Sequence, residues 1–408
     1  MLQGRRALAT EPVEIEAALG RVLGTDVTSP VFLPPHDNSS MDGFAVRAAD
    51  VRGARPDRPA RLHVIGTIAA GGEPTRALEP GEAARIMTGA HVPAGADSVV
   101  RVEDTAAGGA GDAVDIIDAR DAGRNIRRRG EDVRRGTVVM RAGTHLGAPH
   151  IGVLASIGCA QPIVYRRPRV AILATGDELV SLAHFADVEA GTHIVSSNSY
   201  SLAAAVREAG GEPVQIGISP DDPAALATRL RAAEGCDLIV TSGGVSVGDF
   251  DYTGRVVAEL GGTLSLWRVR MRPGAPLGFG TLFGVPWLGL PGNPVSALVT
   301  FELFGRPLLR TLAGHAKPHR RTIAVVTADA IQLGAPLTHF LRVVLETGAA
   351  PYPTARLTGS QSSGILTSMS LANALLIVPP EPAERPAGEV LRALALDGEL
   401  GGSETFLG

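Results

Sequence analysis

The sequence predicts a multidomain protein of the α/β plus β class, in which a central, mainly parallel α/β domain is flanked by two β-rich domains. Apolar strands alternate with helices between Pro168 and Leu312, which is the pattern of a parallel sheet. Short β-rich runs separated by Gly and Pro turns occupy both flanks of this region. The length of 408 residues also exceeds what one hydrophobic core usually serves.

The chain begins with a short predicted helix from Glu14 to Leu23, followed by Gly24. This region is too small to be a domain by itself. From Asp42 to Asp132 short strands predict an all-β unit, and a second one begins near Lys317. We predict four parts, namely a linker domain of residues 1–34 with 133–166, a β-rich inserted domain of residues 35–132, an α/β domain of residues 167–316 and a C-terminal β domain of residues 317–408.

The α/β domain shows its elements in order. Strands are predicted at residues 169–175, 212–219, 236–242, 264–271 and 285–290. Helices are predicted at residues 197–211, 221–235 and 294–312, of which the last two have proline in the first turn.

Composition excludes several functional classes. The 38 Lys and Arg against 42 Asp and Glu give a net charge of −4, which argues against a protein held mainly by nucleic acid. No apolar run reaches the ~18 residues of a membrane span, and acidic residues interrupt the first twenty positions, unlike a signal peptide. Cys159 and Cys236 stand alone in apolar surroundings, as core thiols of a reducing compartment do. We therefore expect a soluble cytoplasmic protein.

Three polar loops follow predicted strands of the α/β domain, at residues 175–178, 241–249 and 291–294. Glycine lets the backbone approach a ligand closely, and Ser and Thr add hydroxyl donors. Each loop alone could be only a tight connection, but three in one sheet predict a ligand site at its carboxyl edge. Neither GxGxxG opening a helix nor GxxxxGK[ST] occurs, so we expect an anionic, heterocyclic ligand outside the standard nucleotide folds.

Acidic residues gather at loop positions rather than on helix faces. Asp221 and Asp222 precede a helix, where they either cap it or take part in a site. Asp249 and Asp251 end the second loop. Carboxylates of this kind suit Mg²⁺, which takes few protein ligands and keeps waters.

Basic residues form two groups. Arg268, Arg270 and Arg272 alternate along a predicted strand and so share one face, where they either grip an oxyanion or protect a sheet edge. The Arg-rich segment 120–135 is either a solvated loop or a rim that faces anions. Neither a GxSxG elbow nor HExxH spacing is present, which leaves chemistry based on positioning and a metal ion.

Eight motifs in order closely resemble the molybdopterin molybdenumtransferases, a family that includes the gephyrin E domain. They are LPPHDNSSMDGFAVR (33–47), RIMTGAHVPAGADSVVRVED (85–104), IRRRGEDV (126–133), ATGDEL (174–179), TSGGVSVGDFDYT (241–253), RPGAPLGFG (272–280), LGLPGNPVSALVTF (288–301) and LTGSQSSGILTSMSLANAL (357–375). The resemblance implies a homodimer of elongated four-domain subunits, dimerised through the linker domain. It also implies insertion of molybdate into adenylylated molybdopterin with release of AMP, assisted by Mg²⁺. The active cleft would lie between the α/β domain of one subunit and the β domain of the other.

The resemblance also implies the site residues. Catalytic roles fall to Asp42, Thr88, Asp132, Glu178, Asp221, Asp251, Arg268, Arg272 and Ser363. Ligand-binding positions are Thr175, Gly176, Asp177, Ser242, Gly243, Gly244, Ser246, Gly248, Pro291, Gly292, Asn293 and Pro294. Within these sets we expect Asp221, Asp251 and Glu178 to hold Mg²⁺, and Arg268 and Arg272 to bind molybdate.

Three features depart from the family pattern. Arginine replaces the frequent lysine at 268 and 272, and Ala275 replaces a lysine, which removes one cation near the oxyanion. Met1 lies near the start of the resemblance, so an N-terminal helix of relatives is absent or lies upstream. Two alternatives remain open: a pterin-binding scaffold without turnover, and the adenylyltransferase that activates molybdopterin. That adenylyltransferase could also be a transient partner, whereas nucleic acid and membrane partners are not expected.

Overall fold

A computed structural model describes residues 1–106, 111–244, 252–347 and 351–396. The chain forms two compact units. The first unit comprises Met1–Glu11, Gly20–Gly24 and the chain from Ile163 onward, and the second comprises Pro12–Leu19 and Thr25–Pro162.

The first unit contains the predicted α/β domain, built on a six-stranded sheet in the order β15-β12-β16-β20-β19-β17. Its first four strands in this order are parallel, and β19 is antiparallel to both of its neighbours, β20 and β17. This arrangement confirms the prediction of a mainly parallel sheet. The strands are β12 (Arg169–Thr175), β15 (Glu212–Ser219), β16 (Leu238–Ser242), β17 (Thr263–Arg268), β19 (Pro276–Leu282) and β20 (Val285–Leu290).

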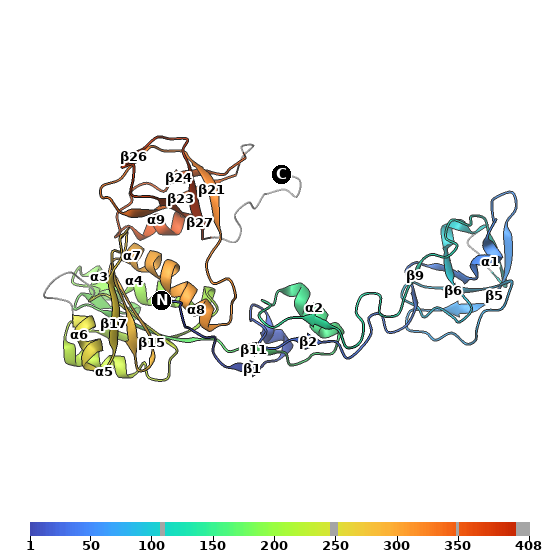
Figure 1. The fold of residues 1–408 in the computed structure, drawn as a ribbon, viewed down its shortest axis with the longest axis horizontal. Coiled ribbons are helices and arrows are strands. Elements are labelled where there is room, and N and C mark those ends of the chain that lie inside the picture. Colours follow the sequence, from blue (N-terminus) through green and yellow to red (C-terminus); the bar gives the residue numbers. More distant parts are fainter. Residues whose placement is uncertain (107–110, 245–251, 348–350, 397–408) are drawn as a thin grey trace. The chain divides into compact units, whose positions relative to one another are not determined.

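Helices cover both faces of this sheet (Figure 1). Side chains alternate along β12, so that Val170 and Ile172 pack on one face while Ala171 and Leu173 pack on the other. On the first face lie α4 (Ser197–Glu208), α7 (Pro294–Thr300) and α8 (Arg306–Leu312), and on the second lie α5 (Pro223–Arg231) and α6 (Tyr252–Glu259). The predicted helix 294–312 is therefore present, with a π-helical turn at Phe301–Gly305 between α7 and α8. Smaller elements are β13 (Leu179–Val180), η4 (Leu182–His184), α3 (Phe185–Glu189) and β14 (Ile194–Val195).

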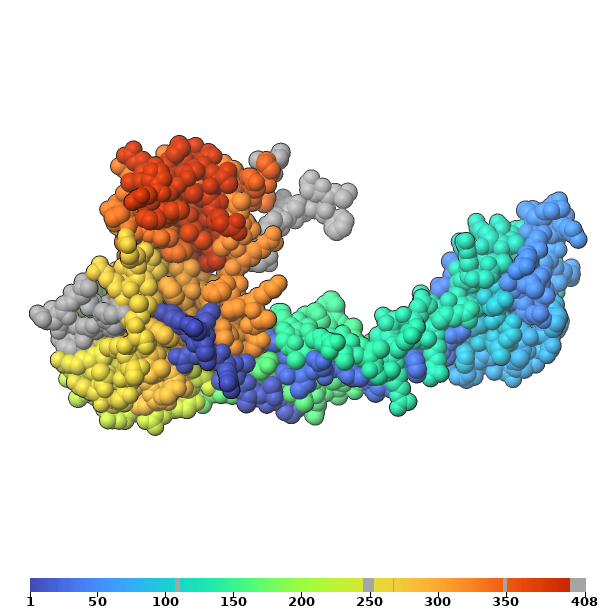
Figure 2. Space-filling model, in the orientation of Figure 1, coloured from blue at the N-terminus to red at the C-terminus, as the bar shows by residue number. Residues whose placement is uncertain are grey.

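The predicted N-terminal helix is largely wrong. Only Ile15–Ala18 form a 3₁₀ turn, η1, and Gly20 with φ of 75° ends it. The next residues are extended, because the Tyr165 N–H donates to the Val22 carbonyl at 2.9 Å. The first residues instead pack on the α/β domain, where the Leu8 N–H donates to the Leu312 carbonyl at 2.9 Å (Figure 2). Strands β1 (Thr10–Pro12) and β11 (Ile163–Tyr165), which are far apart in the sequence, pair with each other in a two-stranded sheet.

The C-terminal β domain of the first unit closes on itself, because β23 pairs with both β24 and β25. Its sheet has the order β18-β23-β24-β21-β27-β25 around a core that includes Val325, Val343 and Leu376. The elements are β18 (Met271–Arg272), β21 (Thr322–Thr327), β22 (Ile331–Gln332), β23 (Thr338–Glu346), β24 (Thr354–Leu357), α9 (Leu366–Leu371), β25 (Ala374–Val378), β26 (Glu384–Arg385) and β27 (Val390–Ala395). Strand β18 comes from the segment between β17 and β19, so this segment contributes to both domains.

The second unit is built on a five-stranded sheet in the order β7-β4-β6-β5-β8. Both sheet faces are buried, by Phe44 and Ile116 on one side and by Ile86 and Val99 on the other. The elements are β2 (Val27–Thr28), β3 (Asn38–Ser39), β4 (Gly43–Val46), α1 (Ala48–Val51), β5 (Ala60–Ile68), β6 (Glu82–Ile86), β7 (Ser98–Arg101), η2 (Val102–Asp104), β8 (Ala113–Ile116), β9 (Ile126–Arg127), β10 (Val138–Met140) and α2 (Ala148–Ser156).

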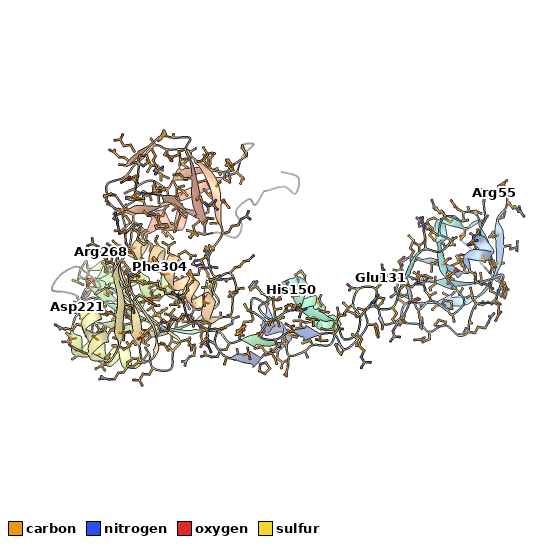
Figure 3. All side chains as sticks on the ribbon, viewed as in Figure 1. Arg55, Glu131, His150, Asp221, Arg268 and Phe304 are labelled. Atoms are coloured by element: carbon orange, nitrogen blue, oxygen red, sulfur yellow. The ribbon has the colours of Figure 1, made fainter. Side chains whose placement is uncertain are left out.

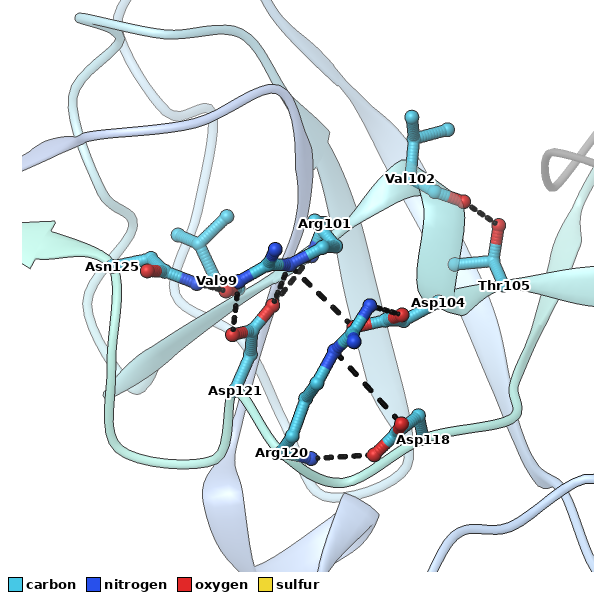
Figure 4. Close-up of polar contacts among 9 residues, drawn as sticks. All are labelled: Val99, Arg101, Val102, Asp104, Thr105, Asp118, Arg120, Asp121 and Asn125. Atoms are coloured by element: carbon cyan, nitrogen blue, oxygen red, sulfur yellow. Dashed lines mark hydrogen bonds and ion pairs between the residues drawn. The ribbon is translucent and has the colours of Figure 1, made fainter.

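Part of the Arg-rich segment has a structural role in this unit. Arg120 pairs with Asp104, and Asp121 accepts two hydrogen bonds from the Arg101 guanidinium at 2.8 and 3.0 Å (Figure 4). Arg128 pairs with Asp37 at 2.7 Å. These three arginines are therefore neutralised by acids of the same unit.

The structure also bears on the two cysteines and on membrane-spanning segments. Cys236 is buried and Cys159 is partly buried, and both are free thiols. Within the described residues, none of the helices has the length and apolar character needed to cross a membrane.

Candidate functional site

A cavity of about 1510 Å³ lies in the first unit, at the carboxyl edge of the parallel sheet. Its lining includes the ends of β12 and β16, the start of α4, and the C-terminal domain from Ala330 to Arg342 and from Leu357 to Leu366. Thirteen of the predicted site residues line it: Thr175, Gly176, Glu178, Asp221, Ser242, Gly243, Gly244, Arg272, Pro291, Gly292, Asn293, Pro294 and Ser363. The described parts of the three polar loops predicted from the sequence therefore meet in one hollow.

The first loop folds a carboxylate over a glycine. The Gly176 N–H donates to the Ser219 carbonyl at 3.1 Å, which joins the ends of β12 and β15. Gly176 has φ of 152°, and a Cβ at this position would lie 2.5 Å from Oε2 of Glu178. A larger residue at this position would displace the Glu178 carboxylate.

The two acids before α5 have different roles. The Asp222 carboxylate accepts a hydrogen bond from the Ala225 N–H at 2.7 Å and caps α5. Asp221 instead lines the cavity, and its N–H donates to Oδ1 of Asp177 at 3.0 Å. Burial, followed by the negative charges of Asp177 and Glu178, raises the pKa of the Asp221 carboxyl. The capping alternative therefore holds for Asp222, whereas Asp221 stays a candidate site residue. Glu178 and Asp221 line the cavity, and Asp177, which lies outside the lining, contacts Asp221.

Asn198, which sequence reasoning missed, connects the second and third loops. Its Nδ2 donates to Oγ of Ser242 at 2.6 Å and to the Gly292 carbonyl at 2.8 Å. Because a carbonyl only accepts, this bond fixes the amide orientation and leaves Oδ1, which has no partner in the described structure, on the other side. Asn198 is 8% exposed and lines the cavity. The available signal was the polar run Ser196–Ser199 at the buried start of a helix.

The predicted arginine face is wrong, because the strand breaks. β17 ends at Arg268, whereas Arg272 lies on β18, which pairs with β23 of the C-terminal domain. Arg268 lies at the end of its strand (Figure 3) and is outside the cavity lining, which contains Arg272. Turn hydrogen bonds separate them, with the Val269 N–H donating to the Ala275 carbonyl at 3.0 Å. The alternating spacing could not reveal this turn.

Arg342, also missed, shapes the loop that carries Ser363. This fully buried guanidinium donates to the carbonyls of Ser360, Gln361 and Ser362 at 3.0–3.1 Å, and its Nε donates to Oγ of Ser368 at 3.0 Å. All four acceptors are neutral, and burial lowers the pKa of this arginine. The Ser363 carbonyl in turn accepts from the Val295 N–H of α7 at 3.2 Å. A lone arginine inside the apolar strand FLRVVL was the signal for this role.

Three predicted residues lie in the second unit. Oδ1 of Asp42 accepts hydrogen bonds from the N–H and the hydroxyl of Thr88, both at 2.7 Å, and these bonds lower the pKa of the Asp42 carboxyl. Both residues are exposed. Asp132 is exposed as well, and its N–H donates to the Leu33 carbonyl at 3.0 Å. Ser246, Gly248, Asp249 and Asp251 lie outside the described residues.

Of the three carboxylates expected to hold Mg²⁺, the structure describes Glu178 and Asp221. Among the residues that the structure describes, no three His, Cys, Asp or Glu side chains are arranged to hold a metal ion. Mg²⁺ needs only one or two protein carboxylates. Asp221, whose charged form is disfavoured beside Asp177 and Glu178, therefore fits a cation.

A cavity at the carboxyl edge of an open parallel sheet, with glycine loops on one side and Arg272 on the other, is typical of an α/β protein that binds an anionic ligand. Comparison with known proteins narrows this class. Family models match residues 2–158 as "MoeA N-terminal region (domain I and II)", residues 171–311 as "Probable molybdopterin binding domain" and residues 324–396 as "MoeA C-terminal region (domain IV)".

Relatives match over nearly the whole chain. The molybdopterin molybdenumtransferase of Nostoc sp. is 41% identical, covering 91% of this chain and 85% of its own length. Molybdopterin molybdenumtransferase 2 of Mycobacterium tuberculosis is 40% identical and covers 95% of each chain. The crystal structure of the molybdopterin biosynthesis moeA protein from Pyrococcus horikoshii superposes with a TM-score of 0.80 at 30% identity, covering 96% of each chain. The chain belongs to the molybdopterin molybdenumtransferase (MoeA) family.

Proposed function

We propose that this chain is a transferase that inserts molybdate into adenylylated molybdopterin, releasing AMP and giving the molybdenum cofactor. The observation that carries the proposal is the convergence of the described parts of the three polar loops with Arg272 on one cavity, in a chain of this family. A dianionic oxyanion and a phosphate-bearing pterin repel each other by ~1 kcal/mol per charge pair in water and by more in a drier cleft. Bringing them together is therefore the main task of the site.

The two sides of the cavity divide this task. Arg272, which has no acidic partner in the described part of the chain, provides a planar donor for the oxyanion. The loops after β12, β16 and β20 offer backbone and hydroxyl groups to the pterin and its phosphate. Arg268 is a second candidate for oxyanion binding, although it lies outside the cavity lining.

Mg²⁺ would be held by Asp221 and Glu178, together with Asp251. When bound there, the ion supplies a charge that offsets the anhydride oxygens. Without a cation, Asp177, Glu178 and Asp221 would repel the same ligand. The carboxylates therefore select for a substrate that arrives with a divalent ion.

Asp42, Thr88 and Asp132 would reach the cavity from a second subunit of a homodimer in the cytoplasm. The exposed Asp42–Thr88 contact, held by two hydrogen bonds of 2.7 Å, supports this because it is already ordered on the surface of its own unit. Molybdopterin adenylyltransferase is the partner that would deliver the intermediate.

The function is tested by incubating the protein with purified adenylylated molybdopterin, molybdate and Mg²⁺ and measuring AMP and cofactor. We expect AMP release that depends on molybdate. A scaffold would release none, and an adenylyltransferase would require ATP and free molybdopterin.

The shared site is tested by mixing two inactive variants, Asp42→Asn and Asp221→Asn. Random exchange makes half of the dimers mixed, and each mixed dimer has one intact site, so about a quarter of the wild-type activity should return. No recovery after confirmed subunit exchange would place all these residues in one subunit or outside the site.

A further inference from the structure

His339 stands in the cavity wall beside the arginine assigned to the oxyanion. It lies on β23, is 5% exposed and lines the cavity. The parallel pairing of β18 with β23 puts Arg272 opposite His339 in register. Gly334 completes this wall, since a Cβ there would lie 3.3 Å from an Nη atom of Arg272.

The hydrogen bonds of His339 show which nitrogen can titrate. Nε2 lies 3.3 Å from the Ala335 carbonyl, which can only accept. Nε2 therefore carries a hydrogen in both protonation states, and the proton is gained or lost at Nδ1. Among the described residues, Nδ1 has no hydrogen-bond partner.

The charged groups around His339 are few. β18 presents Arg272, and β25 presents the apolar Val378 at the paired position. The 330–337 segment presents the Ala335 carbonyl, and Arg342 follows on β23 itself. Burial lowers the pKa of His339, the hydrogen bond to the Ala335 carbonyl opposes this effect, and the positive charge of Arg272 adds to the lowering. The net lowering of the pKa favours the neutral imidazole in the free protein.

We propose that His339 is a proton-dependent oxyanion-binding residue, which takes up a proton at Nδ1 when a tetrahedral dianion binds beside Arg272. The proposal rests on the proposed function, in which Arg272 binds molybdate. The bound dianion cancels the charge of Arg272 and favours the imidazolium, whose Nδ1–H then points to an acceptor. This wall would thereby obtain a second cation only in the loaded state, and Ala275, which also lines the cavity, supplies none.

Linkage sets the size of the effect. If binding takes up one proton, the Kd for the oxyanion rises by up to tenfold per pH unit as the pH increases between the free and bound pKa values of His339. Outside that interval the Kd does not depend on pH. A histidine with only a structural role would show no such coupling.

The experiment titrates molybdate alone into the full-length protein by calorimetry at pH 6.5, 7.5 and 8.5, where the oxyanion stays fully deprotonated. Two buffers of different ionisation enthalpy report the protons taken up per ion bound. Wild type should take up a proton and bind more weakly as the pH rises. His339→Gln, whose amide can still donate to Ala335, should lose both properties, whereas the exposed His319→Gln should retain them.

A second variant, Ala275→Lys, guards against misfolding of His339→Gln. It places a permanent cation in the same lining and should reduce the proton uptake. Molybdate binding with unchanged proton uptake in both variants would overturn this inference and leave the proposed function intact. Absence of molybdate binding, or equal binding by Arg272→Ala, would overturn the inference together with the oxyanion role of Arg272.

Discussion

Replacing Asn198 by alanine should loosen two ligand loops at once. The change removes the hydrogen bonds from Nδ2 to Ser242 at 2.6 Å and to Gly292 at 2.8 Å, each contributing about 1 kcal/mol net. It also removes the unpartnered buried Oδ1, whose burial costs on the order of 1 kcal/mol. The free energy of unfolding should therefore fall by about 1 to 2 kcal/mol.

The loss of ligand affinity should be about as large as the loss of stability. Ser242 and Gly292 lie on different loops, and a Cβ on Gly292 would lie 3.7 Å from the Cα of Gly243, so the two loops are in contact. Without the amide, each loop samples more conformations, and ordering them on binding should weaken the affinity for adenylylated molybdopterin by about tenfold.

Urea denaturation and equilibrium binding measure the two effects separately. Arg207→Ala, an exposed change on the same helix, is the matched control and should alter neither by more than about 0.5 kcal/mol. Asn198→Asp keeps the shape but turns the donor facing the Gly292 carbonyl into an acceptor, and should be at least as damaging. Wild-type affinity and stability in Asn198→Ala would refute the role given to this amide.

Three further predictions concern the cavity. Asp221→Asn should reduce AMP release by more than tenfold, and in the absence of Mg²⁺ it should stabilise the protein at pH 7. The reason is that the folded-state pKa of Asp221 lies above the unfolded value, so its charged carboxylate destabilises the fold once the pH exceeds both pKa values. Thermal unfolding with and without Mg²⁺ measures this effect, and a loss of stability would contradict it. Asp222→Ala, the matched change one residue later, should lower the free energy of unfolding by about 1 kcal/mol through loss of the α5 cap. AMP release by this variant should stay near the wild-type rate. A large loss of turnover would show that Asp222 does more than cap α5. Gly176→Ala should displace the Glu178 carboxylate, because the new Cβ would lie 2.5 Å from Oε2 at φ of 152°. The Mg²⁺ concentration needed for AMP release should then increase. An unchanged dependence on Mg²⁺ would show that Glu178 does not bind the ion.

The sequence predicts the α/β domain well because its signals are local. The alternation of apolar strands with helices, together with proline in the first helical turn, predicted β12, β15 and α5 close to their observed bounds. The three loops were found for a related reason, since the carboxyl ends of parallel strands meet at one edge.

The remaining features depend on distant contacts. Val22 and Leu23 are extended because they pair with residues near 165, which overrides the helical pattern of residues 14–23. Arg272 leaves the strand of Arg268 because β23, some seventy positions later, provides a pairing edge. Asn198 and Arg342 act through backbone carbonyls of other segments, and no motif records such acceptors.

The pairing of β18 with the C-terminal domain also limits how this chain can be cut into separate domains. Met271 and Arg272 belong to the α/β domain by chain order but pair with Thr338 and His339. Truncating the protein after α8 would strip β18 of its hydrogen-bonding edge while leaving the sheet of β17 and β19 intact. An excised α/β domain should consequently fold and keep its glycine loops, yet carry a displaced guanidinium. The cavity wall that holds Arg272 and His339 therefore depends on both domains and would not form in either domain alone.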